Sequence, residues 1–128
     1  MARRRRRFGR GDVGVVATVI VLPGLLLSFW LVLQYAVAAH VRNVAQAAAQ
    51  DAALAVASGG DSGVAGELIG RSAGSLAAGV GVGVGRSTNE VTVTVDVGVL
   101  QIFPIGDFDV SVSASAPIER FIPQPERP

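Results

Sequence analysis

The sequence has neither cysteine nor lysine, and only one histidine, His40, among its 128 residues. Without cysteine the chain can form no disulfide, no thiol nucleophile and no thiolate metal site. Without lysine it offers neither a Schiff base nor the phosphate-binding lysine of a nucleotide-binding loop. A single histidine also excludes a multi-histidine metal centre. We therefore expect a protein that is not an enzyme and that carries no cofactor and no resident metal.

Charge is distributed unevenly along the chain, although the formal net charge is only +1. Residues 1–12 carry six arginines and one aspartate, residues 13–39 carry no charged side chain, and residues 40–128 carry five arginines and nine acidic residues. This division is typical of a chain whose two ends lie in different environments. The length allows one small domain rather than two.

Residues 13–39 form an uninterrupted uncharged segment that is mostly apolar. About 20 helical residues cross the hydrocarbon core of a bilayer, so the segment predicts a single transmembrane helix. Basic residues before the span and an acidic excess after it predict a cytoplasmic N-terminus and an extracytoplasmic C-terminus in the cell membrane. We interpret residues 1–12 as a basic cytoplasmic tail that sets topology, with no nucleic-acid partner. The basic residues are Arg3, Arg4, Arg5, Arg6, Arg7 and Arg10.

Pro23 lies inside the predicted span. Proline has no backbone N–H to donate to the carbonyl of Val19, and its ring crowds that carbonyl, so we expect a helix kink here.

Residues 40–57 are rich in alanine and contain neither glycine nor proline, which predicts that the helix continues beyond the membrane. We expect it to end at Ser58-Gly59-Gly60. Arg42, Gln46 and Gln50 recur every four residues and form a polar stripe, which we expect to set the register of helix packing. Another face carries small apolar residues, which we expect to pack closely against copies of the chain or against partners. These residues are Val41, Val44, Ala45, Ala48, Ala52 and Ala55.

The remainder of the chain predicts a second short helix within residues 63–79, followed by strands. Valine alternates with glycine over residues 80–84 and with threonine, aspartate or glycine over residues 91–99. Over residues 108–116 phenylalanine, valine or alanine alternates with aspartate or serine, and this period of two predicts a half-buried antiparallel sheet. The fold class is therefore α+β and membrane-anchored, with residues 40–121 forming an exterior helix and sheet and residues 122–128 a proline-rich tail. Asp107 and Asp109 are expected on one strand face, as solvated charges rather than a calcium site.

The order of these features resembles the TadE-like proteins, and actinobacterial members in particular. The resemblance rests on the basic tail with Arg10-Gly11-Asp12, the proline-containing helix, the segment RNVAQAAAQDAA over Arg42–Ala53, and Glu119-Arg120-Phe121 after the strands. This family consists of small pseudopilin-type components of the tight-adherence pilus apparatus. The resemblance implies a structural role in pilus assembly. It also implies pilus subunits or assembly-platform proteins as partners, with a homo-oligomer as a further alternative.

Two processing events remain open at the level of sequence. In the family a glutamate precedes the helix proline by six residues and accompanies cleavage after an upstream glycine, so the resemblance makes Gly11 and Gly14 candidate cleavage positions. Ala17 stands where that glutamate is expected, which favours a permanently anchored accessory protein over a filament subunit. The alternative is signal-peptide cleavage near Ala38, at an A-x-A match, which would release a small exported binding domain.

Overall fold

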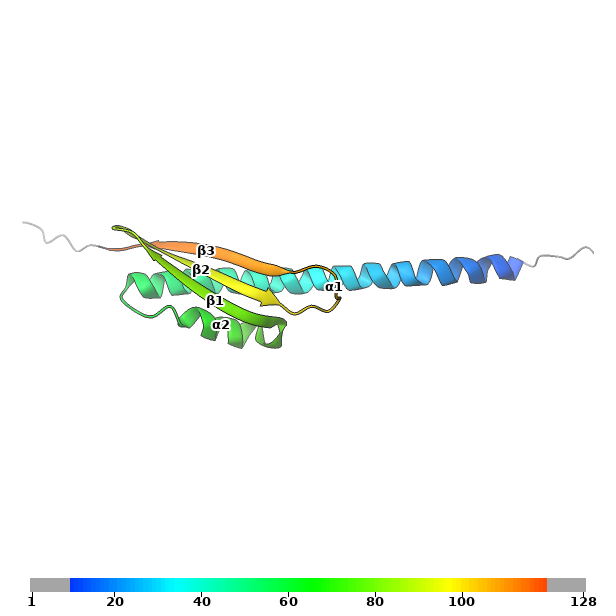
Figure 1. The fold of residues 1–128 in the computed structure, drawn as a ribbon, viewed down its shortest axis with the longest axis horizontal. Helices are drawn as coiled ribbons and strands as arrows, with labels where there is room; N and C mark the ends of the chain where they lie inside the picture. Colours follow the sequence, from blue (N-terminus) through cyan, green and yellow to red (C-terminus); the bar gives the residue numbers. More distant parts are fainter. Residues whose placement is uncertain (1–9, 120–128) are drawn as a thin grey trace, which may run out of the picture.

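The computed structural model describes residues 10–119, and the segments with Arg3–Arg7 and 122–128 lie outside this range. Figure 1 shows one long helix whose second half carries a second helix and a sheet, while its first half projects alone. This arrangement confirms the predicted α+β class. The elements are α1 (Arg10–Ala57), α2 (Val64–Ser72), a 3₁₀ turn (Gly74–Leu76), β1 (Ala77–Arg86), β2 (Glu90–Val99) and β3 (Asp109–Pro117).

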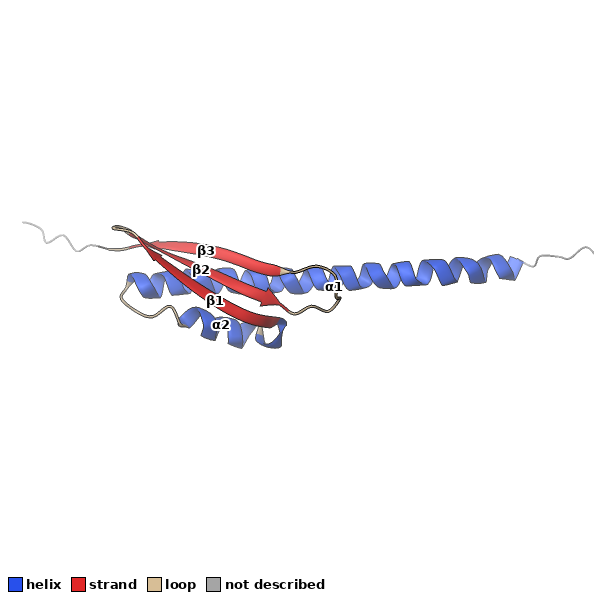
Figure 2. Cartoon of the chain, viewed as in Figure 1, coloured by secondary structure: helices blue, strands red, loops and turns tan. Residues whose placement is uncertain are grey.

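The three strands form an antiparallel sheet in the order β1-β2-β3. The register aligns valine with valine across the sheet: Val95 of β2 faces Val82 of β1 on one side and Val112 of β3 on the other. Successive side chains of a strand point to opposite faces, so this register gathers the valines on one face. That face lies on the second half of α1, which makes a two-layer domain (Figure 2).

The core lies between the sheet, α1 and α2. The buried valines of β2 and the alanines of α1 belong to one cluster. Alanine lets the helix backbone approach the sheet closely, because it adds only a methyl group to the interface. The face of small residues that we expected to meet copies or partners is thus covered by the chain's own sheet and α2, which corrects that prediction. Its buried members are Val41, Ala45, Ala48 and Ala52, with Val44 and Ala55 half-buried.

α1 ends where the sequence predicts, at the Ser58-Gly59-Gly60 segment. Gly59 has φ +89°, and the Gly60 amide donates to the Ala55 carbonyl at 2.7 Å while the Gly59 amide donates to the Val56 carbonyl at 3.1 Å. This is a Schellman motif, in which a glycine in the left-handed region satisfies the last free carbonyls of a helix.

The second helix is shorter than the predicted segment 63–79. It ends at Ser72, and Gly74, with φ +53°, turns the chain so that β1 begins at Ala77. The valines of β1 are also less buried than the alternation predicts: Val80, Val82 and Val84 remain about 40% exposed. The reason is that α1 packs mainly on β2 and β3, whereas β1 is accompanied only by the short α2.

The first half of α1 runs through Pro23 as one continuous helix, so the proline does not end it, and the kink expected there stays a prediction. Two hydroxyl groups in this half donate to backbone carbonyls one turn earlier: Thr18 Oγ1 to Gly14 O at 2.8 Å and Ser28 Oγ to Gly24 O at 2.9 Å. These bonds satisfy the polar side chains within the helix itself, as an apolar environment requires.

Candidate functional site

Helix α1 has two halves with different surroundings. Every residue from 11 to 32 is exposed, including Val13 (72%) and Ile20 (70%), and the most apolar 18-residue window has a mean hydropathy of 2.5 with none of it buried. These 22 residues extend about 33 Å at 1.5 Å per residue, which matches a hydrocarbon core of about 30 Å. This half is long and apolar enough to be a membrane span.

The packed domain begins earlier on α1 than the predicted boundary at residue 39. Leu33 is half-buried, Gln34 is buried, and Val37 and Ala38 pack against the core. We call residues 33–119 the head. The predicted span 13–39 therefore divides into an exposed part that ends at residue 32 and a final two turns that belong to the head.

Gln34 ties the helix to the loop between β2 and β3, residues 100–108. Its side chain is 1% exposed; Nε2 donates to the Leu100 carbonyl at 3.2 Å, and Oε1 accepts from the Ile102 amide at 2.8 Å. Both ends of one side-chain amide thus satisfy two backbone groups of a loop that lies more than 60 residues away in sequence. We call this arrangement the Gln34 clasp.

The same loop is braced from within by Gln101. Its Nε2 donates to the Gly106 carbonyl at 2.7 Å and to Asp107 Oδ1 at 3.3 Å. These bonds join the beginning of the loop to its end. At the tip, the Ile105 amide donates to the Phe103 carbonyl at 2.8 Å. The loop is consequently held in one shape at one position along α1.

Sequence reasoning did not single out Gln34. The available signal was a single side-chain amide within a long apolar segment. In a membrane or in a protein core, such an amide needs a hydrogen-bond partner. The signal indicates that a partner exists. It does not indicate that the partner is the backbone at residues 100–102.

The predicted polar stripe lies on the outside of α1. Arg42, Gln46 and Gln50 are all exposed, and none of them makes a hydrogen bond or an ion pair with another residue of the range 10–119. The structure therefore brings these three side chains together on one open helix face. Their role in packing register stays a prediction.

The candidate cleavage positions, Gly11 and Gly14, lie at the N-terminal end of α1. Gly11, Gly14 and Ala17 are exposed in its first turns, and a Cβ added at either glycine would meet nothing within 4 Å. The glycines are thus not required by packing within the chain. Arg10 is the first residue of the helix.

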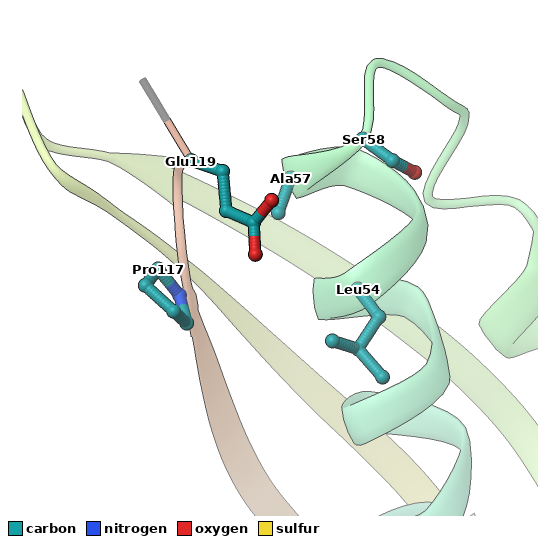
Figure 3. A pocket seen from close by; sticks show the side chains of 5 residues that line it. All are labelled: Leu54, Ala57, Ser58, Pro117 and Glu119. Carbon is teal, nitrogen blue, oxygen red and sulfur yellow. The ribbon is translucent and has the colours of Figure 1, made fainter. Parts of the chain in front are cut away.

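Two open grooves flank the second half of α1. One, of about 230 Å³, lies at the far end of the head, where the Glu119 side chain points toward the last turns of the helix (Figure 3). The other, of about 270 Å³, lies between α1 and α2 and includes His40 and Asp51. Both are smaller than the range of roughly 300–1,000 Å³ typical of small-molecule sites. The first groove is lined by Leu54, Ala57, Ser58, Pro117 and Glu119.

The acidic pair is placed differently from the prediction. Asp107 belongs to the loop and accepts the bond from Gln101, whereas Asp109 is the first residue of β3, so the two do not share a strand face. Over residues 10–119, no three His, Cys, Asp or Glu side chains are grouped so that they could hold a metal ion.

Comparison of the chain with protein-family models, with curated proteins and with solved structures finds no match.

Proposed function

We propose that this chain is a single-pass membrane-anchored structural protein of tight-adherence pilus assembly, similar to TadE-like pseudopilins. Its N-terminus lies in the cytoplasm and its head outside the cell membrane. The observation that carries the proposal is the division of one continuous helix into an exposed apolar half, residues 11–32, and a half that forms the core of the head. Because no flexible linker joins the two halves, the helix holds the head at a fixed distance from the bilayer.

The role in pilus assembly is supported by the resemblance and by the placement of its most specific segment. Residues 42–53 form the part of α1 whose inner face builds the core and whose outer face carries the open polar stripe. The inner face of this segment thus stabilises the head, and its outer face is free to bind partners along the helix. The elements also follow one another in the order that the resemblance implies, a long helix and then short strands.

The geometry favours the retained anchor over release by cleavage near Ala38. A mature domain that starts at Ala39 would lack Gln34, so the Leu100 carbonyl and the Ile102 amide would lose their partner. It would also lack Val37 and Ala38, which pack against the core. A signal peptide is a disposable segment, whereas these residues contribute to the fold of the head.

The polar stripe of Arg42, Gln46 and Gln50 is the face that we assign to partners. An arginine and two amides on an exposed helix face can fix register through hydrogen bonds to a neighbouring helix, of a pilus subunit, an assembly-platform protein or a second copy. The stripe selects the partner's position, because exposed polar groups contribute more to specificity than to affinity.

Simultaneous replacement of Arg42, Gln46 and Gln50 by alanine tests this assignment in a deletion strain complemented with the variant. We expect the free energy of unfolding of the head to change by less than about 0.5 kcal/mol, because exposed groups without partners in the fold contribute little. Deletion of the chain should abolish surface pili, wild type should restore them, and the triple variant should not. The measurement is the number of surface pili per cell by electron microscopy, with protein levels checked in the membrane fraction.

The matched control replaces Glu67 and Arg71 of α2, an exposed ion pair at 3.2 Å, by alanine. Such a pair contributes only about 0.3–0.5 kcal/mol, so this variant should fold and should restore pili. Full restoration of pili by the triple variant would refute the role of the stripe. Normal pili in the deletion strain would refute the role in pilus assembly and leave the membrane anchor standing.

A further inference from the structure

The loop between β2 and β3 lies at the end of the head that is nearest the exposed half of α1 (Figure 1). Ile105, at its tip, is 63% exposed and Leu100 is 41% exposed, while residues 100–106 carry no charge. Two exposed large apolar side chains on one uncharged loop form a surface that suits an apolar partner.

The Gln34 clasp determines how far along the helix this loop lies. Gln34 is two residues beyond residue 32, where the exposed half ends, which corresponds to about 3 Å along the helix axis. The exposed half is as long as a hydrocarbon core is thick, so a bilayer around it would have its outer boundary at the level of the loop. Trp30 and Tyr35, 37% and 75% exposed, flank the same level and are residue types enriched at membrane interfaces.

We propose that the loop of residues 100–108 is a second membrane contact of this protein, with Ile105 and Leu100 inserted among the lipids of the outer leaflet. The proposal rests on the anchoring role proposed above and adds the lipid surface as the specific partner of this loop. Apolar side chains held at the boundary of headgroups and acyl chains bury about 5–10 Å into it, as interfacial helices do.

The hydrogen bonds of the loop suit this position. Backbone groups that enter a lipid boundary lose water and need partners from the protein. Gln34 satisfies the Leu100 carbonyl and the Ile102 amide, and Gln101 satisfies the Gly106 carbonyl. The first acidic side chains, Asp107 and Asp109, come after the tip, where the chain returns to the sheet.

The consequence is a fixed orientation of the head. A helix alone permits the head to rotate about the helix axis and to tilt with it. A second contact beside the helix restricts both motions, so that the polar stripe of residues 42–50 presents one direction to its partners. The loop thus orients the face that meets partners.

Single-cysteine labelling tests the contact cleanly, because the chain contains no cysteine of its own. Full-length Ile105→Cys, Val19→Cys and Ser87→Cys variants, each carrying the fluorophore NBD, are reconstituted into phosphatidylcholine–phosphatidylglycerol vesicles. Val19 lies in the middle of the exposed half of α1, and Ser87 lies in the turn between β1 and β2 at the other end of the sheet (Figure 1). Quenching by lipids that carry a nitroxide near the headgroup or deep in the chain reports depth.

We expect the shallow nitroxide to quench the Ile105 probe at least about twofold, the deep nitroxide to quench the Val19 probe, and neither to quench the Ser87 probe. Adding Gln34→Ala to the Ile105→Cys variant should lower the shallow quenching towards the Ser87 level, because the clasp is lost. Adding Glu67→Ala together with Arg71→Ala, which removes an exposed ion pair of α2 outside the polar stripe and the loop, should leave the shallow quenching unchanged.

The remaining outcomes separate this proposal from the anchoring role. An Ile105 probe that behaves like the Ser87 probe while the Val19 probe is quenched overturns the loop contact and leaves the anchor intact. An Ile105 probe with a blue-shifted emission but no quenching by lipid nitroxides also overturns it, because a protein surface then covers the loop. Absence of quenching at all three positions overturns both the contact and the anchor.

Discussion

Replacement of Ala45 by leucine is expected to lower the free energy of unfolding of the head by about 2–3 kcal/mol. Ala45 is fully buried within the core that α1 shares with the sheet, and three added carbon atoms have no space between the layers. Overpacking of a close-packed interior typically has this cost, because side chains leave their rotamers or the layers separate. Denaturant unfolding of the full chain in detergent micelles, followed by circular dichroism, measures the change.

The matched control is Ala47→Leu, two residues further along the same helix. Ala47 is exposed, so the same added volume should change the free energy of unfolding by less than about 0.5 kcal/mol. Equal effects at the two positions would mean that the sheet does not lie on the face of α1 that contains Ala45. The packing described for the head would then be wrong.

Replacement of Gln34 by alanine is expected to destabilise the head by about 2 kcal/mol. The change removes two hydrogen bonds and leaves the Leu100 carbonyl and the Ile102 amide without their partner, and each unsatisfied group costs about 1–3 kcal/mol where water cannot replace it. The loop should also lose its fixed position on α1. We therefore expect faster hydrogen exchange at the Ile102 amide, measured by nuclear magnetic resonance, together with the drop in stability.

Gln46→Ala is the control for this prediction, because it removes a glutamine from the same helix at an exposed position. It should leave both the stability and the exchange rate at Ile102 unchanged. A Gln34→Ala variant as stable as wild type, with the Ile102 amide still protected, would show that the clasp contributes nothing to the fold. The loop would then be held by its own internal bonds alone.

Local patterns in the sequence predicted the elements of the head. Strict alternation over residues 91–99 and 108–116 reports a pleated strand with one buried face, and β2 and β3 lie there. The alanine-rich segment without glycine predicted the continuation of α1, and the Gly59-Gly60 pair predicted its end. These properties depend on neighbours in the chain, so a single sequence contains them.

The identity of what covers each face could not be predicted in the same way. A stripe of small residues such as Ala45 and Ala52 fits a neighbouring helix, a copy of the chain or its own sheet equally well. Likewise the valines of β1 follow the same pattern as those of β2, yet they stay partly exposed because no long helix lies beneath them. Gln34 shows the limit most clearly, because its partners depend on how the whole chain folds.

The most direct test of the retained membrane anchor is the intact mass of the protein recovered from carbonate-washed membranes. We predict that the chain stays in the washed membrane pellet and has the full mass of 13.1 kDa, with the span and Gln34 retained. A membrane-bound chain that begins at Asp12 or Val15 would indicate pilin-type processing after Gly11 or Gly14 and would favour a filament subunit over an accessory protein. A chain that begins at Ala39 and is found in the medium would contradict the anchored structural role.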